Sequence, residues 1–217
     1  MTSTKFLGIQ INSFIGWKDH INTITKKISR AIGVIRSIRY RLSVKTAMLL
    51  YDALILSQIS YCNIVWASTY KTSLNKIHSL QKRALKLCMG KSHYYTKNNR
   101  PLLNHTPCSI FKQSNTFSVF DINKFQIIKF IFQVLNNLSP PCFADLFTRI
   151  SSVHTHKTRS EDKNNLFLRQ AKTNFRKFGL SVRGPQIWNE LPITLKSLSS
   201  PNVFYKNLKK HFMTMQN

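Results

Sequence analysis

Apolar residues recur every three or four positions between Trp17 and Leu42, which is the spacing of one face of an α-helix. The apolar seam consists of Ile21, Ile24, Ile28, Ala31, Ile35, Ile38 and Leu42. Basic residues lie outside the seam with almost no acidic residue to pair with them, namely Lys26, Lys27, Arg30, Arg36, Arg39 and Arg41. The pattern predicts a long amphipathic helix with a positively charged outer face.

Two more helices are predicted between residues 43 and 90, and we expect the rest of the chain to pack around them. From Val44 to Trp66 apolar residues cover every face, which predicts a helix buried on all sides, with Ser43 as its N-cap. The next helix has one apolar stripe and stops at Gly90. The stripe is Leu74, Ile77, Ala84, Leu85 and Cys88, and the basic residues beside it are Lys76, Lys82, Arg83 and Lys86.

The segments on either side of these helices carry weaker patterns. Residues 5–12 alternate enough to predict a short strand, in which Gly8 permits a bulge or a close approach, and its partner strand need not lie in this chain. Residues 91–118 are mostly polar, contain Pro101 and Pro107, and show no period, so they predict a linker.

The C-terminal part is predicted to be mostly helical. Asp121 opens a helix whose inward residues are Ile122, Phe125, Ile128, Phe132 and Leu135. Residues 148–165 predict an exposed loop, and residues 166–183 predict extended, hairpin-like structure. Ser200 and Pro201 predict the start of a last helix. Its apolar face is Phe204, Leu208 and Phe212, with Lys206, Lys209 and Lys210 opposite.

Charge is the strongest feature of the composition. The 217 residues include 33 Lys and Arg against 7 Asp and Glu, a formal net charge of +26. Such an excess indicates a polyanionic partner, and nucleic acid is favoured over an anionic membrane because the basic residues are spread along the chain.

Residues 44–67 approach membrane-spanning length, but Lys45, Asp52 and Asn63 interrupt them. No signal peptide is evident, so we expect a nuclear or cytoplasmic protein that is not secreted.

Catalytic and metal-binding patterns are weak. Four cysteines lack any CxxC pairing, which favours free thiols, and Cys88, His93, His105 and Cys108 do not have a standard structural-zinc arrangement. His154 and His156 lie in the predicted basic loop, where neither needs a metal. No glycine-rich phosphate loop and no Ser-His-Asp motif is present, so no metal, cofactor or small-molecule substrate is predicted. Trp66 and Trp188 are interpreted as core anchors.

The chain contains an ordered set of motifs, namely KFLG at 5–8, WKDHI at 17–21, LYDALILSQISYCNIVWAST at 50–69, LQKRALKLC at 80–88, FDINKFQ at 120–126, HTHKTRS at 154–160 and GPQIWNELP at 184–192. This set resembles the later part of the reverse transcriptase of non-LTR (LINE-type) retrotransposons, particularly the jockey-like group. KFLG followed by WKDHI resembles the family's primer-grip hairpin leading into its thumb. The resemblance implies a mainly α fold: a remnant primer-grip strand segment of the palm at 1–16, a helical thumb-like bundle at 17–90, a linker at 91–118, and a smaller, mixed but mostly helical post-thumb lobe at 119–217.

The family's polymerase chemistry uses a palm with an aspartate pair that holds two metal ions. The acidic residues here are Asp19, Asp52, Asp121, Asp145, Glu161, Asp162 and Glu190. Only Glu161 and Asp162 are adjacent, and no YxDD-like sequence precedes them. We therefore expect no catalysis by this chain alone.

The resemblance implies a role in holding RNA, DNA or an RNA–DNA hybrid duplex. Lys5, Phe6, Leu7 and Gly8 would approach a primer end, and Lys26, Lys27 and Arg30 would contact the phosphate backbone. Further basic candidates are Lys82, Arg83, Lys206, Lys209 and Lys210. Two alternatives remain open: part of an enzyme that becomes active when another chain supplies the palm, or a truncated transposon copy with no selected function.

Overall fold

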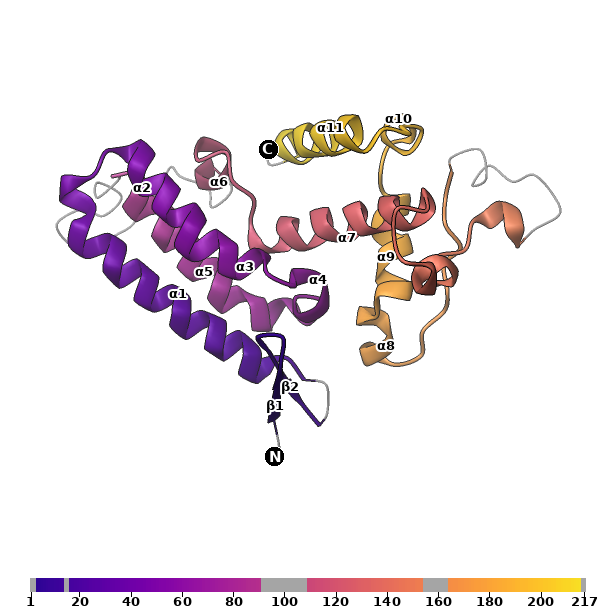
Figure 1. Ribbon diagram of the computed structural model, residues 1–217, viewed down its shortest axis with the longest axis horizontal. Coiled ribbons are helices and arrows are strands. Elements are labelled where there is room, and N and C mark those ends of the chain that lie inside the picture. Colours follow the sequence, from indigo (N-terminus) through magenta and orange to yellow (C-terminus); the bar gives the residue numbers. More distant parts are fainter. Residues whose placement is uncertain (1–2, 14–15, 91–108, 154–163, 216–217) are drawn as a thin grey trace. The chain divides into compact units, whose positions relative to one another are not determined.

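The computed structural model describes residues 3–13, 16–90, 109–153 and 164–215, and their fold is mainly helical (Figure 1). The predicted mainly α fold class is confirmed. Within these ranges the only sheet is a two-stranded hairpin. The described residues up to Ile122 form one compact unit and those from Asn123 to Thr214 form a second. The boundary therefore falls inside helix α7 (Val119–Leu135).

The hairpin consists of β1 (Ser3–Phe6) and β2 (Ile9–Asn12), which pair antiparallel with Ser3 opposite Asn12. Leu7 and Gly8 form the turn, with φ of 46° and 82°. Two consecutive residues at positive φ are typical of the tight turns that close a hairpin. The prediction of a single strand over residues 5–12 was wrong, because this turn folds the segment back so that β1 and β2 pair with each other.

Helix α1 (Lys18–Ile38) buries Ile21, Ile24, Ile28 and Ile35 of the predicted seam. It also buries Ile32, which the prediction left off the seam, whereas Ala31 and Ile38 are only half-buried. The helix ends at Ile38, although the sequence pattern predicted that it would continue to Leu42. The 3-10 turn η1 (Arg39–Arg41) follows, and Leu42 is extended. Ser43 then caps the next helix, since the Thr46 backbone N–H donates to Ser43 Oγ at 3.1 Å, which confirms the predicted N-cap.

The stretch predicted as one continuous helix is divided into pieces. It consists of α2 (Val44–Tyr51), a π-helical turn η2 (Asp52–Leu56), α3 (Ser57–Ser60) and α4 (Asn63–Trp66). The break before α4 lies at Cys62, whose φ of 47° is left-handed. Burial on all sides was also wrong, because Leu49 is 61% exposed. The fully buried residues form one row, namely Ala47, Tyr51, Ile55, Ile59, Asn63, Trp66 and Ala67.

Helix α5 (Lys71–Cys88) lies against α1 and α2 (Figure 1). Its predicted apolar stripe is buried, and Gly90, at φ 67°, follows its last turn as expected. Each fully buried Leu or Ile of this stripe stabilises the fold by about 1.5–3 kcal/mol. Gln81 is buried on the same face and bonds to groups outside the helix. The three helices therefore share one core, and the Gln81 amide makes a polar connection within it.

The polar connection is made by the Gln81 amide. Its Nε2 donates to Tyr51 Oη at 2.9 Å and to the Phe117 carbonyl at 2.8 Å, while Oε1 accepts from the Val119 N–H at 3.0 Å. Val119 begins α7, and Ser118 caps it by accepting from the Asp121 N–H at 3.2 Å. Gln81 thus attaches the start of α7 to α5 and α2.

Residues 109–118 are not a linker. Helix α6 (Ser109–Gln113) places Ile110 and Phe111 in the core of the first unit. Two adjacent apolar residues show no period in the sequence, so only the tertiary contact reveals their role. Residues 91–108, the rest of the predicted linker, lie outside the described residues.

The second unit continues α7 and adds short elements. They are the 3-10 turns η4 (Pro141–Leu146) and η5 (Ile150–Ser152) and the helices α8 (Asn174–Phe178), α9 (Leu180–Asn189), α10 (Ile193–Lys196) and α11 (Pro201–Thr214). The prediction of hairpin-like structure over 166–183 was wrong beyond Leu166, which forms an isolated bridge with Arg149. Thr173 caps α8 by accepting from the Arg176 N–H at 3.3 Å, so helix begins where alternation was predicted.

The core of the second unit is aromatic. Phe132 of α7 stacks on Phe204 of α11, with ring centroids 4.0 Å apart. Trp188 is 3% exposed and Trp66 of the first unit is fully buried, so both are core anchors as predicted. The last helix begins at Pro201 with the Phe204 N–H bonded to the Ser200 carbonyl, also as predicted. Among the described residues, none of the helices combines the length and apolar character needed to cross a membrane.

Candidate nucleic-acid interface

The outer face of α1 carries Lys26 and Arg30, four residues apart and therefore on one side of the helix. Both side chains are exposed, and within the described part of the chain no carboxylate forms an ion pair with either. Gly33 continues the same row, and a Cβ added there would have no atom within 4 Å. This face therefore combines two unpaired cations with a position where a ligand can approach the backbone closely.

Lys27 is exposed as predicted but lies on the flank of α1. Its Nζ donates to Gln58 Oε1 of α3 at 3.3 Å, which holds the ammonium between the two helices. Its charge also reaches His20, whose pKa is lowered, first by burial and then by Lys27. Lys27 therefore extends the cationic face of α1 toward α3.

The hairpin turn presents Lys5, Phe6, Leu7 and Gly8, all of them exposed. Tyr61 supports this turn, because its hydroxyl donates to the Leu7 carbonyl at 2.7 Å and its ring lies 3.6 Å from where a Gly8 Cβ would be. The turn is therefore fixed against the helix break that precedes α4.

The second strand attaches the hairpin to α1. The Gln10 N–H donates to His20 Nδ1 at 3.3 Å, and the Thr23 hydroxyl donates to Gln10 Oε1 at 2.8 Å. Ile9 is buried. The predicted hairpin residues and the predicted α1 cations thus belong to one compact unit.

Lys82 and Arg83 on α5 differ in their surroundings. Arg83 is exposed, whereas Lys82 is half-buried beside His78. The pKa of His78 is lowered, mainly by burial and then by Lys82, with Asp121 acting in the opposite direction. His78 stacks on Phe111 at 5.3 Å. Arg83 is consequently the better placed of the two for a ligand.

Lys206, Lys209 and Lys210 lie on α11 of the second unit, and all three are exposed. On the opposite face Phe204 and Leu208 are buried as predicted, whereas Phe212, the third residue predicted there, is half-buried. This row is an independent basic surface and serves as the natural comparison for the α1 face.

Arg39 was grouped with the solvated cations from its sequence position, and that grouping was wrong. Its Nε donates to the Leu87 carbonyl at 3.0 Å and its Nη1 to the Leu42 carbonyl at 2.7 Å. Leu87 lies in the last turn of α5, where carbonyls lack helical partners and a cation is stabilising. No sequence signal marks this contact, because 48 positions separate the two residues.

Groups for catalysis are dispersed in the described residues. Asp19, Asp52, Asp121, Asp145 and Glu190 lie on different elements, and the described part of the chain holds no group of three or more His, Cys, Asp or Glu able to bind a metal ion. Of the weak zinc candidates only Cys88 is described. It is a buried free thiol whose pKa burial raises to about 11. The others and the loop residues lie outside the described ranges, namely His93, His105, Cys108, His154, His156, Glu161 and Asp162.

Comparison of the chain with protein-family models, with curated proteins and with solved structures finds no match in any of the three. What the surface can bind therefore follows from its own exposed side chains. Lysine binds phosphate as a point charge and arginine binds it through a planar fork of donors, and both groups are present on α1.

Proposed function

We propose that this chain binds nucleic acid duplexes through their phosphate backbone, using the outer face of α1. The observation that carries the proposal is the exposed row of Lys26 and Arg30 without ion-pairing carboxylates among the described residues. A formal net charge of +26 favours the same class of partner. Phosphate contacts position a duplex without reading its sequence, so the binding is sequence-indifferent.

The motifs that resemble a LINE-type reverse transcriptase support a more specific form of the proposal. In that family the primer grip and thumb hold the template–primer duplex, and here the hairpin turn and α1 belong to one unit. In this form the chain is a nucleic-acid-binding part of such an RNA-directed DNA polymerase. It holds RNA, DNA or hybrid duplex and takes no part in nucleotide addition, which needs clustered carboxylates to position metal ions.

Fluorescence anisotropy with a labelled duplex tests the proposal across a salt series. An interface that neutralises about six phosphates gives a slope of log K against log salt of about −5. The variant Lys26→Gln, Lys27→Gln, Arg30→Gln should bind unrelated duplexes more weakly by similar factors and flatten the slope by about one unit per lost contact. Helicity should be unchanged, because all three side chains are exposed.

The matched control is Lys206→Gln, Lys209→Gln, Lys210→Gln on α11, which removes the same charge from the second unit. The proposal expects the α1 variant to lose more affinity than this control. Equal affinity and slope for the α1 variant and the unaltered chain would refute α1 as the interface. A loss confined to the α11 variant would move the interface to the second unit.

A further inference from the structure

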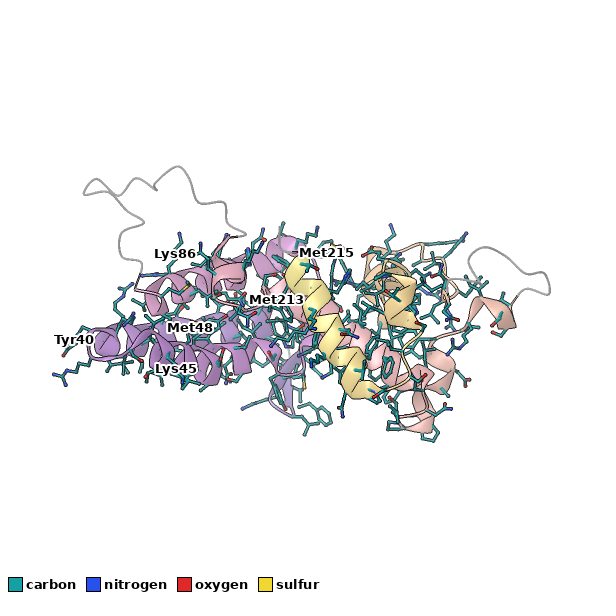
Figure 2. The ribbon with its side chains drawn as sticks, turned by 90° about the horizontal axis from the view of Figure 1, so that it is seen from above. Tyr40, Lys45, Met48, Lys86, Met213 and Met215 are labelled. Carbon is teal, nitrogen blue, oxygen red and sulfur yellow. The ribbon has the colours of Figure 1, made fainter. Side chains whose placement is uncertain are left out.

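The turn between α1 and α2, residues 39–43, ends the helical bundle of the first unit and is called the tip turn below. Tyr40 projects from it with 76% of its surface exposed, more than any other large hydrophobic side chain in the described residues. Figure 2 shows Tyr40 at the outer end of the bundle, with Lys45 and Lys86 further along α2 and α5. Neither the core nor the α1 face uses this ring.

The tip turn is held in a fixed shape. The Leu42 N–H bonds to the Arg39 carbonyl at 3.2 Å, and the Arg39 guanidinium binds the carbonyls of Leu42 and Leu87. Ser43 caps α2 immediately afterwards. An aromatic ring on a fixed turn loses little conformational entropy when it binds a ligand.

One cation lies against the ring, and others lie on the two adjoining helices. Arg41 Cζ lies 5.1 Å from the centroid of the Tyr40 ring, a cation–π contact. Arg36 and Lys45 are exposed on the two helices that meet at the turn, and none of these three cations forms an ion pair with a described carboxylate. An exposed ring beside unpaired cations is the combination with which proteins hold single strands, since bases stack on the ring while cations contact phosphates.

We propose that the tip turn binds single-stranded DNA or RNA by stacking an unpaired base on Tyr40, with Arg36, Arg41 and Lys45 contacting the adjacent backbone. The inference deepens the proposed function and rests on it, because it adds a single-strand site to a unit proposed to hold duplex. Bases inside a duplex are already stacked on each other and have no free face for Tyr40. A membrane is a poorer fit, since such binding scales with buried apolar area and Tyr40 is the one exposed large hydrophobic side chain of the tip turn.

The test compares Tyr40→Ala, Tyr40→Leu and Tyr40→Trp in the full chain, using labelled single strands of about 12 nucleotides. Loss of one stacked base should weaken single-strand binding about 5- to 150-fold in Tyr40→Ala. Tyr40→Leu should lose about as much, since it keeps apolar bulk without a ring, and Tyr40→Trp should bind like the unaltered chain. The affinity of all three variants for blunt duplex should change by less than about two-fold, which is within the error of such measurements, because the α1 face is intact.

A single strand of abasic nucleotides, which keeps the phosphates but has no base to stack on Tyr40, provides the reciprocal control. The unaltered chain should bind it as weakly as Tyr40→Ala binds the normal strand, and the alanine variant should not distinguish the two strands. Circular dichroism checks that each variant is folded. We expect no loss of helicity, because the exposed Tyr40 side chain takes no part in the core.

The outcomes separate this inference from the proposed function. Salt-sensitive duplex binding without single-strand binding, or single-strand binding that is unchanged in Tyr40→Ala or Tyr40→Leu, overturns the tip site and leaves the duplex proposal standing. Absence of binding to either form overturns both. Binding to phosphatidylserine-containing vesicles that requires Tyr40, with no effect of Tyr40→Ala on single strands, assigns the tip to a membrane and also overturns the inference.

Discussion

Gln81 Nε2 donates to the hydroxyl of Tyr51 at 2.9 Å, joining α5 to α2 where neither side chain has any exposed surface. Burial raises the pKa of Tyr51 well above its usual range, so the hydroxyl stays protonated at physiological pH. The same amide satisfies Phe117 and Val119, which precede and begin α7. One polar side chain therefore connects three segments of the core.

Replacing Gln81 by Leu should lower the free energy of unfolding by about 1–3 kcal/mol for each polar group that it leaves buried without a partner. Tyr51→Phe removes one of these bonds and should cost less than Gln81→Leu. Urea unfolding followed by circular dichroism measures both. The control, Gln186→Leu, changes an exposed glutamine and should stay within about 0.5 kcal/mol of the unaltered chain. A similarly small effect of Gln81→Leu would contradict the structural role given to its amide.

Stability of the first unit should fall as the pH is lowered through the range of histidine titration. The pKa values of His20 and His78 are both lowered from the ordinary value of 6.5, mainly by burial. The unfolded chain therefore takes up these protons first, so their contribution is complete above about pH 6.5 and is lost as the pH falls toward the folded-state values. Protonation of His20 Nδ1 would also break its bond from the Gln10 N–H.

Urea unfolding at a pH well above 6.5 and again in the titration range measures this loss. His20→Gln should reduce the pH dependence, and His20→Gln with His78→Gln should reduce it further. His211→Gln, in the second unit, is the control. A pH dependence that the double variant leaves intact would assign the effect to other groups.

Two glycine substitutions should have opposite effects. An alanine Cβ at Gly184 in α9 would lie 2.9 Å from Phe147 Cε1 and 3.2 Å from Ile131 Cδ1. Such overpacking costs about 1–3 kcal/mol and exceeds the gain in helix propensity. Gly33→Ala in α1 meets no atom within 4 Å and should stabilise its helix by about 0.5–1 kcal/mol. Amide hydrogen exchange should show lower protection in α9 for the first variant and higher protection in α1 for the second. Increased protection in α9 of Gly184→Ala would mean that Phe147 yields without cost.

The elements predicted correctly are those whose signal is local and periodic. The isoleucine spacing of α1 and the Ser200–Pro201 start of α11 each carry enough information within one segment. The alternation of residues 5–12 did not predict the hairpin turn, because Leu7 adopts positive φ, which is uncommon for a residue with a Cβ. Helix α9 was not predicted for two reasons. The LFLR sequence at 166–169 has the alternation of an extended segment, and Pro185, which normally disfavours a helix, lies inside α9.

The candidate site could be predicted to a similar extent. Exposure of Lys26 and Arg30 follows from the seam of their own helix, so the sequence was sufficient for both. The role of Arg39 depends on where the end of α5 lies in space, and the prominence of Tyr40 depends on where α1 ends. Neither fact is contained in a local pattern, and both appear only when the helices are packed.

The π-helical turn η2 allows a row of residues spaced by four to stay on the core. Ala47, Tyr51, Ile55 and Ile59 would drift round a regular α-helix by about 40° at each step, since that helix has 3.6 residues per turn. A wider turn takes up the difference and is geometrically equivalent to one inserted residue. Deleting a single residue within 52–56 would therefore convert the π turn into regular α-helix and leave the later part facing the core. Inserting one more residue would instead rotate the later part by about 100° and turn Ile59 and Trp66 away from the core, so this segment tolerates a deletion better than an insertion.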